Sequence, residues 1–380
     1  MLCLFFLALS TSSSTNRPEP IWTEDQDISG EFTAAMVTVN NVRSVAVDDS
    51  GNVHVVFTGN NGPVYNVYYR LSRAGSWEDL EQISNSEAPT ISDAPALALG
   101  PSGEVGIVWC EGWSSNYDLF MCKRIDGAWA EPETVTSDST FSLAPCPSFS
   151  EDGTLHLVWE NRRGEASSVM YANRPGSEWS VPLTLSDPKA NAVAPSLTVG
   201  PRGRLHAVWT ESDGETRKIV YREKSGAGWL KAKALSKDDY SANRPSVATD
   251  ADGGVHVVWE DHRADSPAVC YMERRSGKWS RDVLLTDGTS KAYRPVVDVG
   301  PDMTVHAAWY DDEWGPTEAV YRRRAGDGWE PAERLTNSSV ATYFVSLAAG
   351  DDGSVHVIFQ DKRDGAYKVY YKTAGPPLRD

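Results

Sequence analysis

The chain has 380 residues, and its 53 Asp and Glu against 36 Lys and Arg give a formal net charge of −17. A surface this acidic repels the phosphates of nucleic acids and of anionic lipids, so we expect neither as a partner. No stretch approaches the ~18 consecutive apolar residues that a membrane-spanning helix needs, so we expect no membrane span.

The first 20 residues are typical of an export segment followed by a linker. Met1–Leu9 is a short apolar run followed by Ser and Thr, with small residues suited to cleavage near Ala8-Leu9-Ser10. No Lys or Arg precedes this run, unlike in an ordinary secretory signal. The segment ends in the linker-like Arg17-Pro18-Glu19-Pro20. We therefore expect a secreted or extracytoplasmic protein in which residues 21–380 form a single domain.

One short string, Val-His-Val-Val-Trp at 255–259, recurs with small changes along the whole chain. The aromatic residues that end its seven copies are Phe57, Trp109, Trp159, Trp209, Trp259, Trp309 and Phe359. The spacing is 50 residues from Trp109 onward and 52 residues in the first interval. A period of this length is typical of solenoids, propellers and other arrays.

Each repeat carries four strand signals in the same order. The first strand usually follows a proline 14 residues before the aromatic residue, at Pro95, Pro145, Pro195, Pro245 and Pro295. A tight turn such as Asp351-Asp352-Gly353 leads to the second strand, which contains the string and which we expect to be buried on both faces. The third strand ends near Tyr69, Met121, Tyr171, Tyr221, Tyr271, Tyr321 and Tyr371. The fourth begins at Trp77, Trp129, Trp179, Trp229, Trp279 and Trp329.

No stretch shows a 3.6-residue apolar period with helix caps, so helix should be nearly absent. Four short antiparallel strands per repeat describe a propeller blade. The seventh repeat ends at Asp380 without its fourth-strand Trp, whereas Ile21-Trp22 precedes the first complete repeat. We therefore predict an all-β, seven-bladed β-propeller of four-stranded antiparallel blades. Residues near 21–30 would supply the outer strand of the last blade and close the ring.

Residues that recur in almost every repeat cannot mark a single active site, so we interpret them as structural. The six repeated histidines are His54, His156, His206, His256, His306 and His356, and we expect them to be hydrogen-bonded between blades. The five cysteines show neither a CxxC pair nor metal-ligand spacing, so we expect small buried side chains. The sequence predicts no metal site and no cofactor.

Candidate functional residues lie where the repeats differ, at the end of the ring where second strands finish and first strands begin. The position before the first-strand proline is Ala94, Ala144 and Ala194 in three repeats but Arg244 and Arg294 in the next two, and Arg43 replaces the proline of the first repeat. One residue earlier stand Asp93, Tyr293 and Tyr343, and the loop after the second strand adds Glu260, Asp261 and Arg263.

Arginines can hold a carboxylate through two hydrogen bonds, and tyrosine rings can cover a sugar face, so these residues suit a polar, acidic sugar. A rim of salt bridges that only holds the loops in place explains the same residues. Binding sites between blades remain open as a further alternative.

Over residues 40–373 the chain resembles the secreted sialidase-like (BNR-type) repeat propellers. The resemblance rests on patterns such as Asp-Gly-Gly-Val-His-Val-Val-Trp-Glu-Asp-His-Arg at 252–263 and Gln-Asp-Lys-Arg-Asp-Gly at 360–365. The blade layout is also similar to that of bacterial seven-bladed propeller lectins, which bind sugars between blades.

The sialidase resemblance implies an Arg-Ile-Pro motif, three arginines on the substrate carboxylate, an acid/base Asp and a Tyr–Glu nucleophile pair. The chain departs from this pattern because Arg43 is followed by Ser44-Val45, and because the strict Asp-box is missing before the fourth strand. A substitute site would use Arg43, Arg244 and Arg294 for the carboxylate, Tyr343 or Tyr293 as nucleophile and Asp93 as acid.

These observations favour a secreted, non-catalytic propeller that binds carbohydrate or a protein partner at the channel mouth or between blades. The alternative is a sialidase-like exo-glycosidase acting on acidic sugars. A polysaccharide lyase using a Tyr or Arg at the mouth is a third hypothesis.

Overall fold

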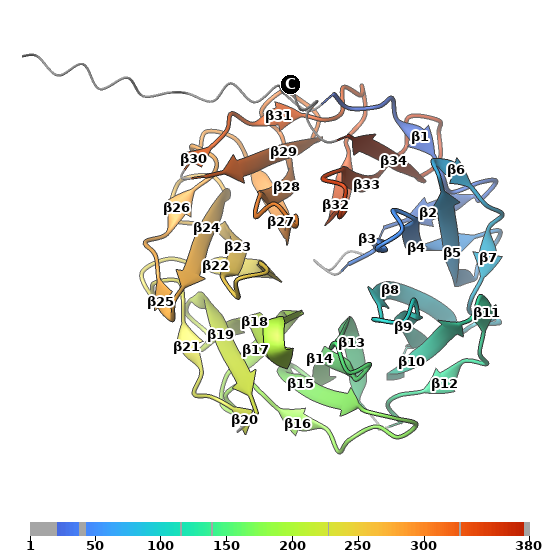
Figure 1. Ribbon diagram of the computed structural model, residues 1–380, viewed down its shortest axis with the longest axis horizontal. Coiled ribbons are helices and arrows are strands. Elements are labelled where there is room, and N and C mark those ends of the chain that lie inside the picture. The colour runs from blue at the N-terminus through green and yellow to red at the C-terminus, as the bar shows by residue number, and fades with distance from the viewer. Residues whose placement is uncertain are drawn as a thin grey trace, which may run out of the picture.

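The computed structural model describes residues 21–37, 43–114, 116–137, 140–226, 228–326 and 328–375. Within these ranges the chain is built of strands that pair antiparallel, apart from one parallel bridge between β10 and β13, and it contains no α-helix, as predicted. One 3-10 turn, η1, spans Pro201–Gly203. Figure 1 shows the sheets arranged in a ring. The described part of the chain thus contains no helix that is long and apolar enough to cross a bilayer. The export-like segment 1–20 lies outside the described residues.

We number the repeats as units 1 to 7 in chain order. β1 (Gln26–Asp27) precedes unit 1, which contains β2 (Ala34–Met36), β3 (Val45–Val47), β4 (Val53–Asn60), β5 (Tyr65–Arg73), β6 (Ser76–Trp77) and β7 (Glu81–Gln82). Unit 2 contains β8 (Ile91–Leu99), β9 (Val105–Trp113), β10 (Asn116–Ile125), β11 (Ala128–Trp129) and β12 (Glu133–Thr134). Unit 3 contains β13 (Phe141–Phe149), β14 (Leu155–Arg163), β15 (Ala166–Arg174) and β16 (Leu183–Thr184).

Unit 4 contains β17 (Asn191–Gly200), β18 (Arg204–Ser212), β19 (Arg217–Ser225), β20 (Gly228–Trp229) and β21 (Lys233–Ala234). Unit 5 contains β22 (Ala242–Thr249), β23 (Val255–Asp261), β24 (Ala268–Arg275), β25 (Lys278–Trp279) and β26 (Val283–Leu284). Unit 6 contains β27 (Ala292–Val299), β28 (Val305–Asp311), β29 (Glu318–Ala325), β30 (Gly328–Trp329) and β31 (Glu333–Arg334). Unit 7 contains β32 (Tyr343–Ala349), β33 (Val355–Asp361) and β34 (Lys368–Ala374).

The order of strands within a unit follows the sequence prediction. In unit 5 the order is β22-β23-β24-β25, with β26 also on β24, so the fourth strand is split into two short pieces. The repeated string lies on the second strand, and every residue of β23 is buried. A side chain on either face of this strand therefore packs against a neighbouring unit, which explains why apolar residues run along it without alternation.

The N-terminal segment forms the outer strand of the last sheet, whose order is β1-β34-β33-β32. Gln26 and Asp27 pair antiparallel with Tyr371 and Tyr370, and Trp22 forms an isolated bridge with Ala374. Figure 1 shows β1 beside β34, although most of the chain separates them in sequence. The segment thus occupies, on unit 7, the place that the fourth strand occupies in the other units.

Neighbouring units contact each other through a recurring aromatic pair. The fourth-strand Trp of one unit lies edge-on against the third-strand Tyr of the preceding unit, with ring centroids 5.0 or 5.1 Å apart. The pairs are Trp129–Tyr69, Trp229–Tyr171, Trp279–Tyr221, Trp329–Tyr271, Trp22–Tyr321 and Trp77–Tyr371. Edge-to-face pairs of this kind add about 1 kcal/mol to the burial of the rings.

The six repeated histidines are buried and hydrogen-bonded, but their partners differ from the prediction. Each ring Nδ1 lies 2.7 to 2.9 Å from the hydroxyl of the third-strand Tyr in the same unit, as His256 does with Tyr271. The hydroxyl then carries the contact to the next unit, because Arg324 Nη1 donates to it at 2.9 Å. We had expected a direct bond between blades; the adjacent antiparallel strand supplies a closer partner.

The four described cysteines, Cys110, Cys122, Cys146 and Cys270, are free and buried. This agrees with their interpretation as small core side chains. Burial raises the pKa of the Cys122 thiol to about 11, so this thiol stays protonated at neutral pH.

We expect Trp22→Ala to lower the free energy of unfolding by about 2 kcal/mol, because it removes a half-buried indole and the edge contact with Tyr321. Urea denaturation measures the change. The exposed neighbour Glu24 provides a control, and Glu24→Ala should leave the midpoint unchanged. Equal midpoints for the two variants would show that the N-terminal segment does not hold unit 7.

The buried histidines of the repeats predict that the stability of the fold falls at acidic pH. Burial lowers the pKa of His156, His206, His306 and His356 to about 4, against 6.5 for the unfolded chain. Between pH 6.5 and 4 the unfolded chain therefore binds more protons, so stability is full above pH 6.5 and is lost as the pH falls. We expect His206→Gln to reduce the slope of unfolding free energy against pH by about 1.4 kcal/mol per unit in this window. An unchanged slope in urea titrations would contradict this.

Candidate functional site

A β-bulge recurs at the mouth, the end of the ring where second strands finish and first strands begin. The pairing of first and second strands shifts register at the same place in units 2 to 7, for example between Asn243 and Ser246. The residue inside the bulge has a positive φ in every case. These residues are Ala94 (51°), Ala144 (52°), Ala194 (52°), Arg244 (49°), Arg294 (49°) and Phe344 (54°).

This left-handed conformation costs about 1–2 kcal/mol for a residue with a Cβ, and such residues often lie at functional sites. Units 2 to 4 carry alanine at this position, the residue with the smallest side chain among those that have a Cβ. Units 5 to 7 place Arg244, Arg294 and Phe344 in the same backbone position and so display three large side chains at the mouth.

The amide of the bulge residue anchors it to the preceding unit. Arg244 N donates to Thr210 Oγ1 at 2.9 Å, and Arg294 N donates to Glu260 Oε2 at 3.4 Å. Both acceptors stand directly after the aromatic residue of the repeated string. The backbone of the bulge is thus held between units, which leaves the arginine side chains available for other contacts.

Glu260 is the centre of the polar contacts at this place. Only 2% of its surface is exposed, and its carboxylate accepts from Arg244 Nη1 at 3.2 and 3.3 Å and lies 3.0 Å from His262 Nε2. Burial alone would raise the pKa of this carboxyl, but the hydrogen bond with His262 and the charge of Arg244 outweigh it and lower the pKa. Glu260 is therefore a buried carboxylate ion.

Aromatic rings surround the second arginine. The guanidinium of Arg294 lies 4.9 Å from the ring centre of Phe344, and its charge acts on the hydroxyl of Tyr310. Tyr293 and Tyr343 both lie 5.7 Å from Tyr310, ring centre to ring centre. Burial, opposed by Arg294, raises the pKa of Tyr310.

We call this group the arginine–tyrosine cluster. It consists of Arg244, Glu260, His262, Tyr293, Arg294, Tyr310, Tyr343 and Phe344 from units 5 to 7. Five of the predicted site residues thus meet: Arg244, Glu260, Tyr293, Arg294 and Tyr343.

His262 lies in the predicted mouth loop, between Asp261 and Arg263, but the sequence assigned no role to it or to Tyr310. His262 is the one histidine of the seven that stands outside the repeated string, and Tyr310 stands where the other units have Thr, Cys, Glu or Gln. Both break the repeat, so the signal that identified the arginines would have identified them as well.

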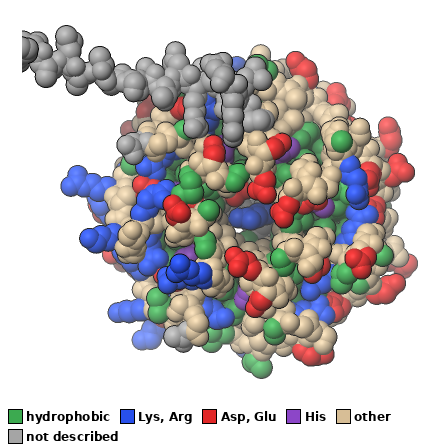
Figure 2. Space-filling view, in the orientation of Figure 1, with side chains coloured by type: hydrophobic (Ala, Val, Ile, Leu, Met, Phe, Trp, Pro, Cys, Tyr) green, Lys and Arg blue, Asp and Glu red, His purple; other side chains and the backbone are tan. Residues whose placement is uncertain are grey.

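The structure does not bring Arg43 to the cluster. Its guanidinium Nη2 lies 3.8 Å from Oδ1 of Asp298, four residues beyond Arg294 on β27. It lines a central cavity of about 280 Å³ formed by first strands of units 1, 2, 3, 4, 6 and 7. Figure 2 shows basic side chains inside the hollow at the centre of one face, with acidic side chains around it. The substitute arginine triad is therefore incomplete.

Asp93 and Tyr343 do not form an acid–nucleophile pair either. Asp93 lies in unit 2, where it accepts from Thr58 Oγ1 at 3.4 Å and from the Ala94 amide at 2.7 Å. Burial raises the pKa of Asp93. Tyr343 lies in unit 7 against Tyr310 and Phe344 and, within the described residues, hydrogen-bonds no carboxylate.

Asp261 and Arg263 belong to an ion-pair network within unit 5 rather than to the cluster. Asp261 is fully buried and accepts from Trp259 Nε1 at 3.1 Å and from Arg263 Nε at 2.7 Å. Arg263 also reaches the Tyr240 hydroxyl at 2.8 Å and the carboxylate of Asp282. Glu260 and Asp261 point to opposite faces of the same strand, so only Glu260 reaches the cluster.

Replacing Arg244 by Met should lower the free energy of unfolding at pH 7 by about 2 kcal/mol, because the buried Glu260 then keeps only His262 and the Arg294 amide as partners. This loss is below the roughly 3–5 kcal/mol of a fully buried pair, since Arg244 is partly exposed. The double variant Arg244→Met/Glu260→Met removes both charges and should recover most of the loss. Urea denaturation measures the free energy of unfolding of both variants. An equal loss in the single and the double variant would show that Glu260 does not depend on Arg244.

No protein-family model matches the chain, and no curated protein sequence matches it either. Solved structures do resemble it. Polysaccharide lyase Uly1 superposes with a TM-score of 0.61 at 9% identity, over 89% of this chain and 91% of that one. A Dyadobacter fermentans protein of unknown function gives 0.59 at 16%, over 77% and 97%. The Hadza microbial sialidase Hz136 gives 0.53 at 14%, over 83% and 74%. At these identities the similarity shows the fold, a β-propeller of the sialidase-like type.

Proposed function

We propose that the protein is a secreted propeller whose arginine–tyrosine cluster binds a carboxylate-bearing sugar at the mouth of the ring. The observation that carries this proposal is the display of Arg244 and Arg294 on equivalent strained bulges beside four aromatic rings. The cluster holds two guanidinium groups and one buried carboxylate, so it is locally cationic on a chain with a net charge of −17. A positively charged cluster on an otherwise negatively charged surface attracts an anionic ligand to that one place.

The chemistry of the cluster fits an acidic saccharide. A guanidinium can form two parallel hydrogen bonds with a carboxylate, and tyrosine rings can pack against the apolar face of a sugar. Two of the similar structures, a sialidase and a polysaccharide lyase, are carbohydrate-active by name, which supports a carbohydrate ligand. Export rests on the apolar run Met1–Leu9 alone.

We further propose that the ring is a closed seven-bladed propeller in which the N-terminal strand completes the last blade. Three contacts support closure. Trp22 and Trp77 make the recurring edge contact with Tyr321 and Tyr371, and Ser44 N donates to Ser346 Oγ at 3.2 Å. A rigid ring would hold the bulges of units 5 to 7 at constant separation around the ligand.

A second candidate function is catalysis, and the His262–Glu260 pair favours it. A partly exposed imidazole held at 3.0 Å by a buried carboxylate is the arrangement of a general base. Next to arginines that bind a uronate carboxylate, it is placed to remove the proton beside that carboxylate, as a lyase requires. A sialidase-like reaction is less well supported, because Arg43 and Asp93 lie away from Tyr343.

Binding of oligogalacturonates and sialyllactose, measured by calorimetry, tests the first proposal. We expect Arg294→Met to weaken binding at least tenfold, equivalent to about 1.4 kcal/mol, through loss of the charged hydrogen bonds. Arg204→Met is the matched control, because Arg204 starts its second strand at the opposite end of the ring and is half exposed. Equal loss in both variants, or equal binding of uncharged methyl esters, would contradict a carboxylate site.

Incubation of the same saccharides with the protein distinguishes binder from enzyme. A lyase would release products with a new carbon–carbon double bond that absorbs in the ultraviolet, and His262→Gln would abolish this signal while retaining binding. Binding without any product supports the non-catalytic function.

A further inference from the structure

A cavity of about 360 Å³ lies between units 5 and 6, away from the arginine–tyrosine cluster. Its wall includes Asp287 and Ser290 from the link after unit 5, and Trp309, Asp311 and Glu313 from the second strand of unit 6 and its loop. Asp311 is 2% exposed. The repeats allow this place to be compared with the same place on other units.

On unit 5 the corresponding space is filled by an arginine of the chain itself. Arg263 donates through Nε and Nη2 to Asp261 at 2.7 and 2.8 Å, and Nη2 also reaches the Tyr240 hydroxyl. Asp282, which follows the fourth-strand Trp, pairs with the same guanidinium.

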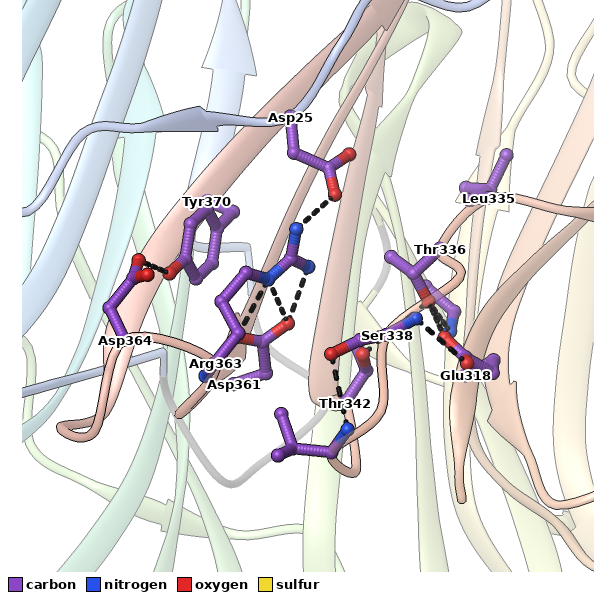
Figure 3. A network of polar contacts seen from close by, with 12 residues as sticks. Asp25, Glu318, Leu335, Thr336, Ser338, Thr342, Asp361, Arg363, Asp364 and Tyr370 are labelled. Atoms are coloured by element: carbon purple, nitrogen blue, oxygen red, sulfur yellow. Dashed lines mark hydrogen bonds and ion pairs between the residues drawn. The ribbon is translucent and has the colours of Figure 1, made fainter. Parts of the chain in front are cut away.

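Unit 7 repeats this arrangement, as Figure 3 shows. Arg363 pairs with Asp361 and donates from Nη1 to Asp25 at 2.6 Å. Asp25 follows Trp22 on the N-terminal segment, as Asp282 follows Trp279. The ring of Tyr370 lies 4.3 Å from the guanidinium. Two units therefore cover the buried aspartate with their own guanidinium group.

Unit 6 keeps the aspartate and lacks its cover. The residues that hold the guanidinium site of unit 5 are all replaced at the equivalent positions of unit 6, 50 residues later. Glu313 replaces Arg263, Ser290 replaces Tyr240, and Ala332 replaces Asp282. All three replacements line the cavity. The cavity is thus the volume that an arginine and a tyrosine occupy in unit 5.

Asp311 also accepts fewer hydrogen bonds than Asp261 does. It accepts from Trp309 Nε1 at 3.1 Å and from the Glu313 amide at 3.0 Å, as Asp261 does from Trp259 and the Arg263 amide. Asp261 accepts two further bonds from a guanidinium. Burial, with Asp311 and Asp287 nearby, raises the pKa of Glu313. The cavity also contains Arg322, whose guanidinium donates to the carbonyls of Glu330 and Leu285.

We propose that this cavity binds the guanidinium group of a ligand, seated on Asp311 as Arg263 is seated on Asp261. Glu313 and Asp287 supply further negative charge in the wall. A planar cation with several donors matches a buried carboxylate better than a compact ammonium does. Within the described residues no three His, Cys, Asp or Glu side chains are grouped to hold a metal ion.

Calorimetric titration with Nα-acetyl-arginine amide tests the proposal. Its citrulline analogue, which has the same shape without the charge, should bind at least tenfold more weakly. Glu313→Arg rebuilds the arginine of unit 5 and should weaken binding at least tenfold while raising the melting temperature. Ser290→Tyr fills the cavity without changing the charge and should also weaken binding at least tenfold.

Asp213→Arg is the matched control, because Asp213 is exposed and stands four residues after Trp209, as Glu313 stands after Trp309. This variant should bind as the unaltered protein does. Equal binding of citrulline, an equal loss in Asp213→Arg, or no loss in Ser290→Tyr would each overturn the proposal. Agmatine and a Gly-Arg-Gly peptide serve as further probes. Tighter binding of agmatine would indicate a small guanidine compound as the ligand, and tighter binding of the peptide would indicate an arginine side chain of a protein partner.

Discussion

The edge contact between a fourth-strand tryptophan and the third-strand tyrosine of the preceding unit is the interaction on which the ring depends. It recurs at 5.0 to 5.1 Å, including the pair Trp22–Tyr321 that joins the N-terminal segment to unit 6. A tyrosine can be buried at this interface only if its hydroxyl is paired. In the six units that have this tyrosine, the histidine of the second strand provides that partner, which explains why six histidines that resemble catalytic groups are structural.

The same regularity creates a mouth whose side chains are free to vary. The bulge amides of Arg244 and Arg294 are held by the preceding unit, so the backbone at this position is set by the ring and not by the side chain it carries. An alanine and an arginine therefore adopt the same left-handed conformation. Units 5 to 7 use this freedom to collect two guanidinium groups, a buried carboxylate and four aromatic rings.

The buried aspartates of units 5 to 7 show a second use of the repeat. Arg263 and Arg363 neutralise two of them within the chain, and a guanidinium on a buried carboxylate is the arrangement that offsets the cost of desolvating both ions. Unit 6 retains the carboxylate and replaces the arginine by Glu313. Departures from the repeat thus mark both candidate sites, one at the mouth and one between units.

The sequence by itself determined the unit, because the 50-residue spacing and the order of strand signals follow from local turn chemistry and apolar pattern. It also indicated that Arg244, Glu260, Tyr293, Arg294 and Tyr343 lie at one end of the ring, since antiparallel strands bring those positions together. Only the tertiary structure placed Arg43 beside Asp298 and Arg263 on Asp261, because these contacts depend on which side chains the folded ring brings together. Contacts between units join residues that are far apart in the sequence, 34 positions in the case of Arg294 and Glu260, and no local pattern specifies them.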